Sequence, residues 1–313
     1  MKSIKNNPVL RQKISKVSFS VFRYLFLISV SYIVIFQIAY IVTYALRLPK
    51  DMYDTSIVWI NKHNSLENIR SAAKLMSYIP SLIITVTVQI LSGLIEVFTC
   101  SVPAYGFSRF KFTGKNILFF CVLISILIPP QMIALPMCLN YAHFDIFGIL
   151  KAIGGLTGGE IRPNLLETGC VFWLPSLFGA GLRSGLFIFI YMQFFKGLPK
   201  ELEEAAALDG ANPVKIFTGI VLPSSGVVIL TVTIFSIVWH WNDYYLSVLY
   251  FSEKYPLSVK LAQLSSMMVS SNVEDNRGIR MAGCLIFILP VLILYTVVQR
   301  KFIKSIDRVG IVG

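Results

Sequence analysis

Apolar residues along this chain gather in long runs that are separated by shorter polar segments. A helix needs roughly 17 residues or more to cross the hydrocarbon core of a membrane, and each run is long enough. Because lipid offers no partners for backbone N–H and C=O groups, such runs must be helices, and the alternation typical of a membrane barrel is absent. The pattern predicts an all-α integral membrane protein with about six transmembrane helices, near residues 22–46, 79–107, 117–139, 169–195, 225–251 and 282–303.

Composition supports a surface that faces a lipid bilayer. Hydrophobic residues make up 55% of the chain, charged residues only 14%, and the mean hydropathy is +0.70. A soluble domain usually carries about 25% charged residues. The net charge of +12 does not indicate nucleic-acid binding, because the basic residues lie just outside the apolar runs and form no stripe with exposed aromatic residues.

The basic residues also predict an orientation. If the N-terminus is cytoplasmic, the inner segments hold 16 Lys and Arg in 75 residues and the outer segments 11 in 99. Positive charge favours the cytoplasmic side, so both termini are expected there. The expected organisation is then a basic cytoplasmic N-terminus (1–23), a first uncleaved span with an extracytoplasmic segment (24–74), and a main transmembrane domain (75–313).

One cytoplasmic segment, residues 196–223, has the pattern of two helices joined by a turn, and we call it the signature loop. Acidic residues early in its first helix suit the helix dipole, and three alanines give a smooth, strongly helical face. Gly210 stands where a left-handed helix end is expected, and Asn212-Pro213 has the pattern of an N-cap followed by Pro at the first helical position. A docking surface for a partner and a plain amphipathic loop are both compatible with this pattern.

A resemblance favours the docking surface. The loop resembles the cytoplasmic EAA motif of binding-protein-dependent ABC importers, E-A-A-x3-G-x9-I-x-L-P, with every fixed position and both gaps matched. The matching residues are Glu204, Ala205, Ala206, Gly210, Ile220, Leu222 and Pro223.

Four further segments resemble the smaller permease subunit of maltose-type, carbohydrate-uptake importers, so that the resemblance covers roughly residues 75–313. The final segment departs from the family pattern at Val312, where a Lys is usual. The segments are Tyr105 to Asn116, Ile128 to Met137, Trp239 to Tyr245, and Gln299 to Gly313.

The resemblance implies a type I ABC importer permease fold in a bacterial cytoplasmic membrane and a role in importing oligosaccharides or related glycosides. The implied partners are a second homologous permease, two ATP-binding subunits that hold ATP and Mg, and an extracytoplasmic sugar-binding protein. This chain is expected to bind no cofactor itself and to be no enzyme. Residues expected to couple to the ATPase are Glu203, Glu204, Ala205, Ala206, Asp209, Gly210, Ile220, Leu222 and Pro223.

Polar residues inside the apolar runs are the candidates for a translocation path. Glu96 lies within the second run, where it either faces a solvated path or forms a structural pair, with Arg183 as one conceivable partner. Asn242 and Asp243 lie among aromatic residues that include Trp241 and Tyr244. This group either contacts sugar or forms an interfacial aromatic belt with a capped helix end.

Catalytic and metal-binding patterns are not found in the sequence. The five cysteines form no C-x-x-C pair, the three histidines have no ligand spacing, and Thr113 to Asn116 lacks the residues of a phosphate-binding loop. Two other classes of function stay open at this point. A membrane enzyme would use Glu96 or Asp243, and a self-sufficient channel or carrier would leave the EAA motif unexplained.

Overall fold

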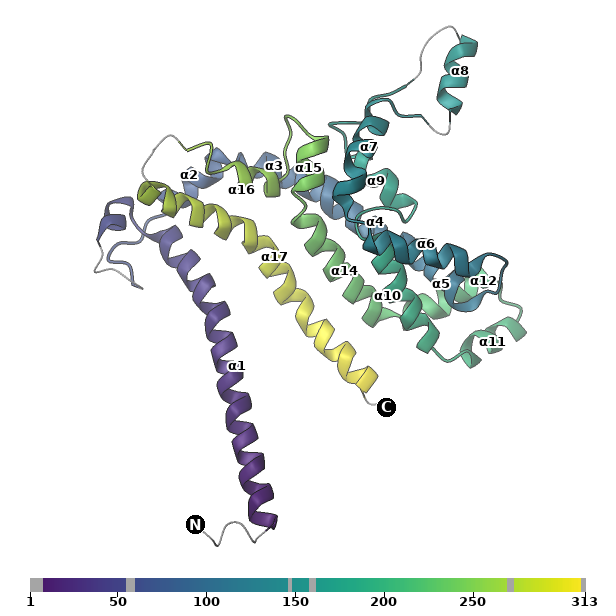
Figure 1. Ribbon diagram of the computed structural model, residues 1–313, viewed down its shortest axis with the longest axis horizontal. Helices are drawn as coiled ribbons and strands as arrows, with labels where there is room; N and C mark the ends of the chain where they lie inside the picture. The colour runs from purple at the N-terminus through teal and green to yellow at the C-terminus, as the bar shows by residue number, and fades with distance from the viewer. Residues whose placement is uncertain (1–7, 55–59, 146–147, 158–161, 269–272, 311–313) are drawn as a thin grey trace. The chain divides into compact units, whose positions relative to one another are not determined.

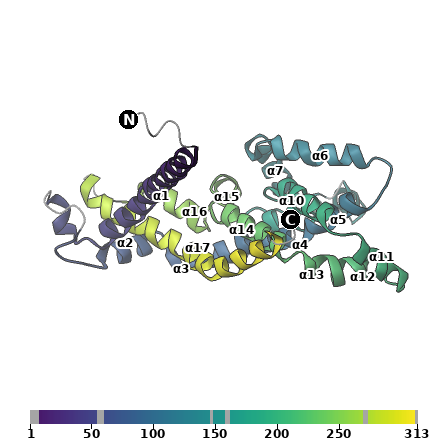
Figure 2. The same ribbon diagram turned by 90° about the horizontal axis from the view of Figure 1, so that it is seen from below.

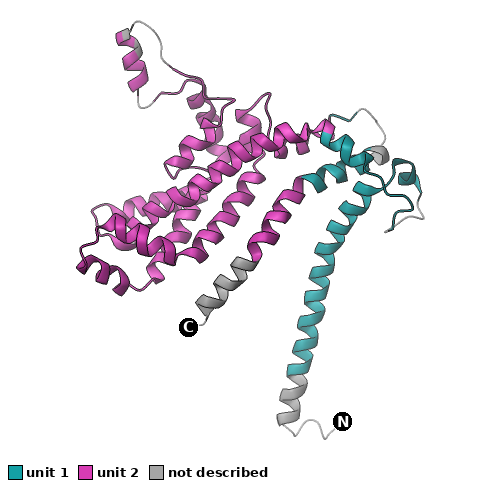
Figure 3. Cartoon of the chain, turned by 180° about the vertical axis from the view of Figure 1, so that it is seen from behind, with its two compact units in different colours: residues 1–73, 267–286 teal, residues 74–266, 287–313 magenta. Residues whose placement is uncertain are grey.

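The computed structural model describes residues 8–54, 60–145, 148–157, 162–268 and 273–310, and these residues are overwhelmingly helical (Figure 1). The chain divides into two compact units, which are distinguished by colour in Figure 3. The first unit comprises residues 1–73 and 267–286, and the second comprises residues 74–266 and 287–313. Each unit is described below by itself.

The first unit is built around the long helix α1 (Pro8–Leu46). Its end packs through Ala45 against Ala72 of α2 (Glu67–Leu75) and Ala282 of α17 (Val273–Gly310), and all three alanines are fully buried. Small side chains let helix backbones approach closely. Between residues 16 and 38 almost all of α1 is exposed, and most of its side chains there are apolar, as expected of a surface that lipid or another protein covers. The short helix η1 (Pro49–Tyr53) follows α1.

Three continuous helical stretches are long and apolar enough to span a membrane: Lys16–Leu46, Tyr78–Arg109 and Asn276–Gln299. Two further spans are obtained if each of two bent helix pairs counts as one, which gives five in the described chain. The fourth apolar run, residues 169–195, is not among them, since it breaks into α9 (Cys170–Leu177) and α10 (Ser184–Gly197). This break explains why about six runs in the sequence correspond to fewer candidate spans in the structure.

The two bends follow local sequence. Helices α6 (Lys115–Leu127) and α7 (Pro130–Ala142) meet at 101°, and Ile128 and Pro129 between them are extended. A residue before proline disfavours the helical conformation, so the Pro129-Pro130 pair enforces this bend. The second bend, of 78°, joins the helical stretch Pro213–Ser224 to α14 (Gly226–Trp241).

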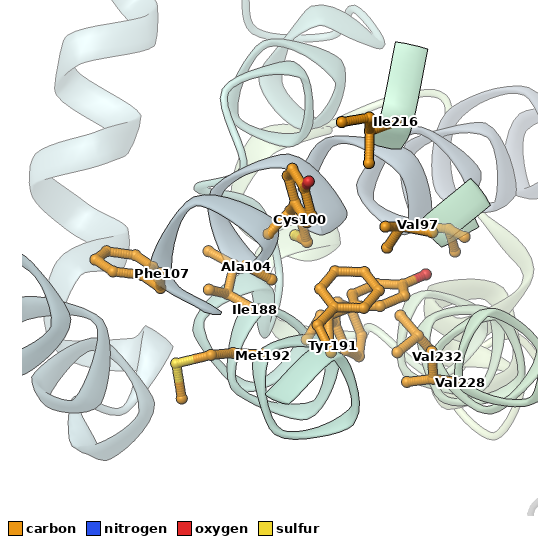
Figure 4. Packing of buried hydrophobic residues seen from close by; sticks show 14 residues of the cluster. Val97, Cys100, Ala104, Phe107, Ile188, Tyr191, Met192, Ile216, Val228 and Val232 are labelled. Atoms are coloured by element: carbon orange, nitrogen blue, oxygen red, sulfur yellow. The ribbon is translucent and has the colours of Figure 1, made fainter. Parts of the chain in front are cut away.

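The core of the second unit lies between the stretch Tyr78–Arg109, α10, α14 and the end of the signature loop. In Figure 4, Val97, Cys100 and Ala104 on one side face Tyr191 and its neighbours on another. The stretch Tyr78–Arg109, α10 and α14 contribute most of this cluster. The elements of the stretch are α3 (Tyr78–Ile84), η2 (Thr85–Ile90), α4 (Leu91–Thr99) and α5 (Ser101–Arg109).

Shorter helices, α8 (Ile149–Thr157), α15 (Tyr245–Tyr250) and α16 (Leu257–Gln263), complete the second unit. Glu167, shortly before α9, contacts the segment between α15 and α16. Its carboxylate accepts hydrogen bonds from the backbone N–H and the hydroxyl of Ser252. Partial burial acts to raise the pKa of Glu167, but these bonds and those from the N–H groups of Glu253 and Lys254 outweigh it and lower the pKa below its ordinary value.

Candidate functional site

The signature loop folds as the predicted pair of helices. Helix α11 (Glu201–Leu208) has its three glutamates in the first turn, and Gly210 after it has φ +84°, the left-handed conformation that glycine adopts at least cost. The Asn212 side chain accepts a 2.8 Å hydrogen bond from the Lys215 N–H and so caps α12 (Pro213–Ile216). The π-helical η3 (Phe217–Val221) and α13 (Leu222–Ser224) continue α12, and Figure 2 shows these elements together at one end.

The EAA residues have different environments. Glu204 and Ala205 are exposed, as is Asp209, whereas Ala206 packs against the core cluster of its own unit. Ile220 and Leu222 are half-buried, and Pro223 is exposed. Two leucines that the motif does not include, Leu202 and Leu208, are 56% and 89% exposed. They add apolar surface to α11, and their spacing of six residues gave no signal by itself.

Glu203 forms an internal clamp between α11 and the end of α5. Its Oε1 accepts a 2.7 Å hydrogen bond from Arg109 Nε, and its Oε2 accepts a 3.0 Å bond from the Tyr105 hydroxyl. Arg109 also donates to the carbonyl of Leu198 at 3.0 Å, just before α11. The side chains of Arg109 and Glu203 are only 8% and 13% exposed. We call this the Arg109–Glu203 clamp, and sequence reasoning missed it because its two halves lie 94 residues apart.

A groove of about 340 Å³ lies beside the clamp. Tyr105, Arg109 and Glu203 line it together with Glu204 and Ala207 from α11. The clamp therefore fixes one wall of a hollow whose rim carries Glu204, an acidic residue at the edge of the second unit.

Glu96 is fully buried among polar groups from other helices. Ser176 Oγ of α9 donates a 3.0 Å hydrogen bond to its Oε1, and His240 Nε2 of α14 lies 3.7 Å from the same oxygen. A Cβ atom at Gly181, in the break of the fourth run, would overlap this carboxylate. Glu96, which belongs to α4, thus contacts both the break and α14. Arg183 has another neighbour, the ring of Trp239, whose centroid lies 5.8 Å from its guanidinium carbon.

His240 is oriented by its own helix. Its Nδ1 lies 2.9 Å from the backbone carbonyl of Ser236, and a carbonyl only accepts hydrogen bonds, so Nδ1 carries the hydrogen. The Ser236 hydroxyl donates to the carbonyl of Gly93 at 3.0 Å, and a Cβ at Gly93 would lie 2.7 Å from that hydroxyl oxygen. Glycines at 93 and 181 therefore leave room for this buried polar group.

The polar residues at the end of the fifth run do not converge on one space. The carboxylate of Asp243 accepts hydrogen bonds from the backbone N–H of Ser247 at 3.0 Å and from its hydroxyl at 2.8 Å, which caps α15. Asn242 is exposed and donates to the carbonyl of Val238 at 2.7 Å. Trp241 is buried beside Phe287, and Tyr244 is 45% exposed. For Asp243, this geometry matches the capped helix end, which was one of the two interpretations of the sequence.

A cavity of about 500 Å³ lies instead at the break of the fourth run. Its wall includes residues 179–186 of the break and the start of α10, and the opposite wall comes from the bent pair α6 and α7. Most lining side chains are apolar or aromatic, and Arg183 is the one charged residue among the described lining residues. The glycines of the break, at 179, 181 and 185, were a sequence signal that the prediction of a continuous span overlooked.

Residues 98–308 match the family described as "Binding-protein-dependent transport system inner membrane component", which is more than half of the chain. The chain belongs to this family. Membership confirms the predicted class of protein, a multi-pass membrane permease, and identifies the chain as a transport component, so the interpretation as a membrane enzyme is wrong.

Relatives of this inner membrane component carry related names. The polygalacturonan/rhamnogalacturonan transport system permease protein YtcP of Bacillus subtilis is 27% identical over 299 residues, which cover 92% of this chain and 96% of the relative. The probable starch degradation products transport system permease protein AmyC of Thermoanaerobacterium thermosulfurigenes is 27% identical over 252 residues, covering 80% and 82%.

A solved structure has the same fold as this inner membrane component. It is a chain of a bacterial ABC transporter involved in the import of the acidic polysaccharide alginate, with a TM-score of 0.70 and 20% sequence identity. The match covers 92% of this chain and 98% of that chain. The all-α permease fold that the sequence predicts is thereby confirmed.

The described part of the inner membrane component contains no cluster of three His, Cys, Asp or Glu residues that could hold a metal ion. Its five cysteines are free thiols.

Proposed function

We propose that this chain is a permease subunit of an ATP-driven importer for oligosaccharides or related glycosides, and that its signature loop couples translocation to a separate ATPase. The observation that carries the proposal is the form of the loop. Glu204 and Ala205 are exposed on a short helix that Gly210 ends in a left-handed turn and that the Arg109–Glu203 clamp fixes to a membrane helix. Such a helix presents a small, acidic, rigid surface to a groove on a partner.

The proposed assembly contains a second homologous permease, two ATP-binding subunits and an extracytoplasmic sugar-binding protein. The family description, a component of a binding-protein-dependent transport system, supports the last of these. Relatives named for polygalacturonan/rhamnogalacturonan and for starch degradation products support a saccharide substrate. ATP and Mg are bound on the ATPase, and closure of that subunit moves the signature loops and rocks the spans.

The proposed docking contact is tested in proteoliposomes that contain the complete complex. An exposed carboxylate such as that of Glu204 suits an arginine on the partner, where a bidentate pair gives geometric definition. Glu204→Lys is expected to abolish substrate-stimulated ATP hydrolysis and saccharide uptake while the permease pair still assembles. Asn212→Ser, which keeps an N-cap, is the matched control. Normal ATPase stimulation in Glu204→Lys would refute the docking role.

Both termini are proposed to be cytoplasmic, with the α15–α16 connection outside. Cysteines introduced at Lys2 and Lys304 should react only with reagents that reach the cytoplasm. A cysteine at the exposed Lys254 should react from outside. Labelling of Lys254→Cys from the cytoplasm alone would reverse the orientation.

The translocation path is proposed to include the polar residues near the ends and bends of the spans. Glu96 lies directly behind the wall of the 500 Å³ cavity, because it contacts the break that forms this wall. Asn242 and Tyr244 are exposed and free to face a partner or substrate, whereas Trp241 and Asp243 act through packing and helix capping. Kinetics of uptake in Asn242→Ala should therefore change more than kinetics in a conservative variant of the buried Trp241.

A further inference from the structure

Arg183 is a cation at the middle of an apolar run. It lies in the break of residues 169–195, where its backbone has φ +66°. Arg183 is exposed and lines the wall of the 500 Å³ cavity. A left-handed conformation is uncommon for a residue other than glycine, and such strain is found most often at functional sites. The backbone conformation at Arg183 is therefore set by the fold of the break and is not that of a right-handed helix.

No protein carboxylate pairs with this guanidinium within the ranges that the structure describes, and its side chain donates no hydrogen bond there. The carboxylate of Glu96, which also lies at the break, accepts its hydrogen bond from Ser176. A charge in the middle of a membrane is costly and is retained where it pairs with another group or lines a path. Arg183 has five N–H donors in a planar fork, which matches the geometry of a carboxylate or a phosphate.

Trp239 holds Arg183 in a defined place. The guanidinium carbon lies 5.8 Å from the centroid of the indole ring, and Phe187 and Phe235 pack on that ring with centroids 5.7 and 5.5 Å away. Contact with an aromatic face engages the flat side of a guanidinium and leaves its edge free. That edge is the part that forms paired hydrogen bonds with a carboxylate or a phosphate.

The surrounding cavity has the size of a small-molecule site and carries aromatic rings on its wall. Its volume of about 500 Å³ lies in the usual range for small-molecule sites, and its described lining contains no acidic residue. Tyr141, Phe172 and Tyr250 contribute aromatic rings to one wall. One fixed cation among apolar and aromatic groups favours a ligand that has both an anionic group and an apolar ring face.

We propose that Arg183 binds the anionic group of the transported saccharide, a carboxylate or a phosphate, as the saccharide passes the break in the fourth run. This inference rests on the proposed importer function and narrows its substrate to an acidic saccharide. A lipid phosphate is a competing ligand of the same chemistry, and it predicts an unchanged substrate preference in Arg183→Gln. An acidic residue of the second permease is another competing partner, and the experiment separates these cases.

The experiment uses the complete complex, with its own ATPase, second permease and binding protein, in proteoliposomes. Uptake of tri-galacturonate is compared with uptake of its neutral methyl ester and of a phosphorylated sugar, for wild type, Arg183→Gln and Arg183→Lys. Loss of one paired interaction with a charged group is expected to lower the preference for the charged over the esterified trimer about 10- to 100-fold in Arg183→Gln. Arg183→Lys should keep part of the preference. Preference for the phosphorylated sugar in place of the uronate would assign phosphate as the anion.

Lys260→Gln is the matched control, because Lys260 also lies over an aromatic ring, 5.5 Å from the Tyr255 centroid, but is not part of the cavity. Its preference should equal that of wild type. An unchanged preference in Arg183→Gln would overturn the proposal, as would loss of the permease pair in Arg183→Gln with recovery in Arg183→Lys, which would assign Arg183 to the second permease. ATP-dependent uptake of neutral saccharides alone would overturn the acidic substrate and leave the importer function intact. Absence of ATP-dependent uptake of any saccharide would remove the proposed function itself.

Discussion

The Arg109–Glu203 clamp gives a quantitative prediction about coupling. Glu203→Ala removes the acceptor of both the 2.7 Å bond from Arg109 and the 3.0 Å bond from Tyr105. Arg109 then retains only its 3.0 Å bond to the Leu198 carbonyl. The start of α11 loses its fixed attachment to the membrane stretch Tyr78–Arg109, while the apolar surfaces of the spans do not change.

The magnitude follows from burial. An exposed ion pair contributes about 0–1 kcal/mol, but removal of one partner from a buried pair costs about 3–5 kcal/mol because the other charge is left without a partner. The Arg109 and Glu203 side chains are 8% and 13% exposed, so the clamp is close to the buried case. Allowing for residual solvent, we expect about 3 kcal/mol, which corresponds to a roughly 100-fold shift in the population of docked α11.

The assay is a double-mutant cycle on the reconstituted complex. Arg109→Ala, Glu203→Ala and the double variant are compared for saccharide imported per ATP hydrolysed. Each single variant should lower this ratio strongly, and the double variant should add little, because residues in direct contact share their effect. Thermal unfolding of each purified variant in detergent measures the stability change separately.

Glu201→Ala is the matched control for this cycle, since Glu201 lies on the same helix turn but is exposed. Its coupling ratio should stay near that of wild type. Equal ratios for Glu201→Ala and Glu203→Ala, or additive effects of the two clamp variants, would show that the clamp does not transmit motion.

Three further predictions concern single positions. Gly210→Val forces a β-branched residue into φ +84° at a cost of roughly 1–2 kcal/mol or more, and should reduce ATPase stimulation, whereas Gly219→Val, at a position with open space around a Cβ, should not. Gly181→Ala places a Cβ on the carboxylate of Glu96, so the variant should unfold at lower temperature than wild type, and an unchanged melting temperature would contradict this packing. The pKa of Glu167 is lower in the folded state than its ordinary value of 4.5, so the ionised carboxylate stabilises the folded state at pH values above 4.5. This contribution is lost as the pH falls through the folded-state pKa. Wild type should therefore melt above Glu167→Gln at pH 6, with the difference shrinking near pH 4.

Local features of the fold could be predicted because their causes are local in sequence. The cap at Asn212 and the left-handed Gly210 follow from residue types at fixed positions, and both are confirmed. The span lengths follow from runs of apolar residues. The bend at Pro129-Pro130 is also local, although its angle of 101° depends on the packing of the two helices that it joins.

The contacts between distant residues could not be predicted, because hydropathy gives the positions of spans but not which of their faces meet. Glu96 and His240 come from different runs, and only the packing of α4 on α14 brings them within 3.7 Å. The same reason hid the partner of Glu203. Asp243 is different, because an Asp at the start of a short helix is a recognisable helix-capping residue, and here it accepts a hydrogen bond from Ser247. A capped helix end was one of the two interpretations that the sequence left open.

The exposed surface of α1 has a consequence for biosynthesis. The most apolar part of the stretch Lys16–Leu46 buries none of its residues, and within its unit the helix is anchored near its end, at Ala45. A helix of this kind partitions into lipid without help from the rest of the chain, because membrane insertion precedes helix association. The ribosome can therefore deliver it to the bilayer as soon as it is made, so that the first span fixes the chain's place in the membrane before the residues that pack around Ala45 have been translated.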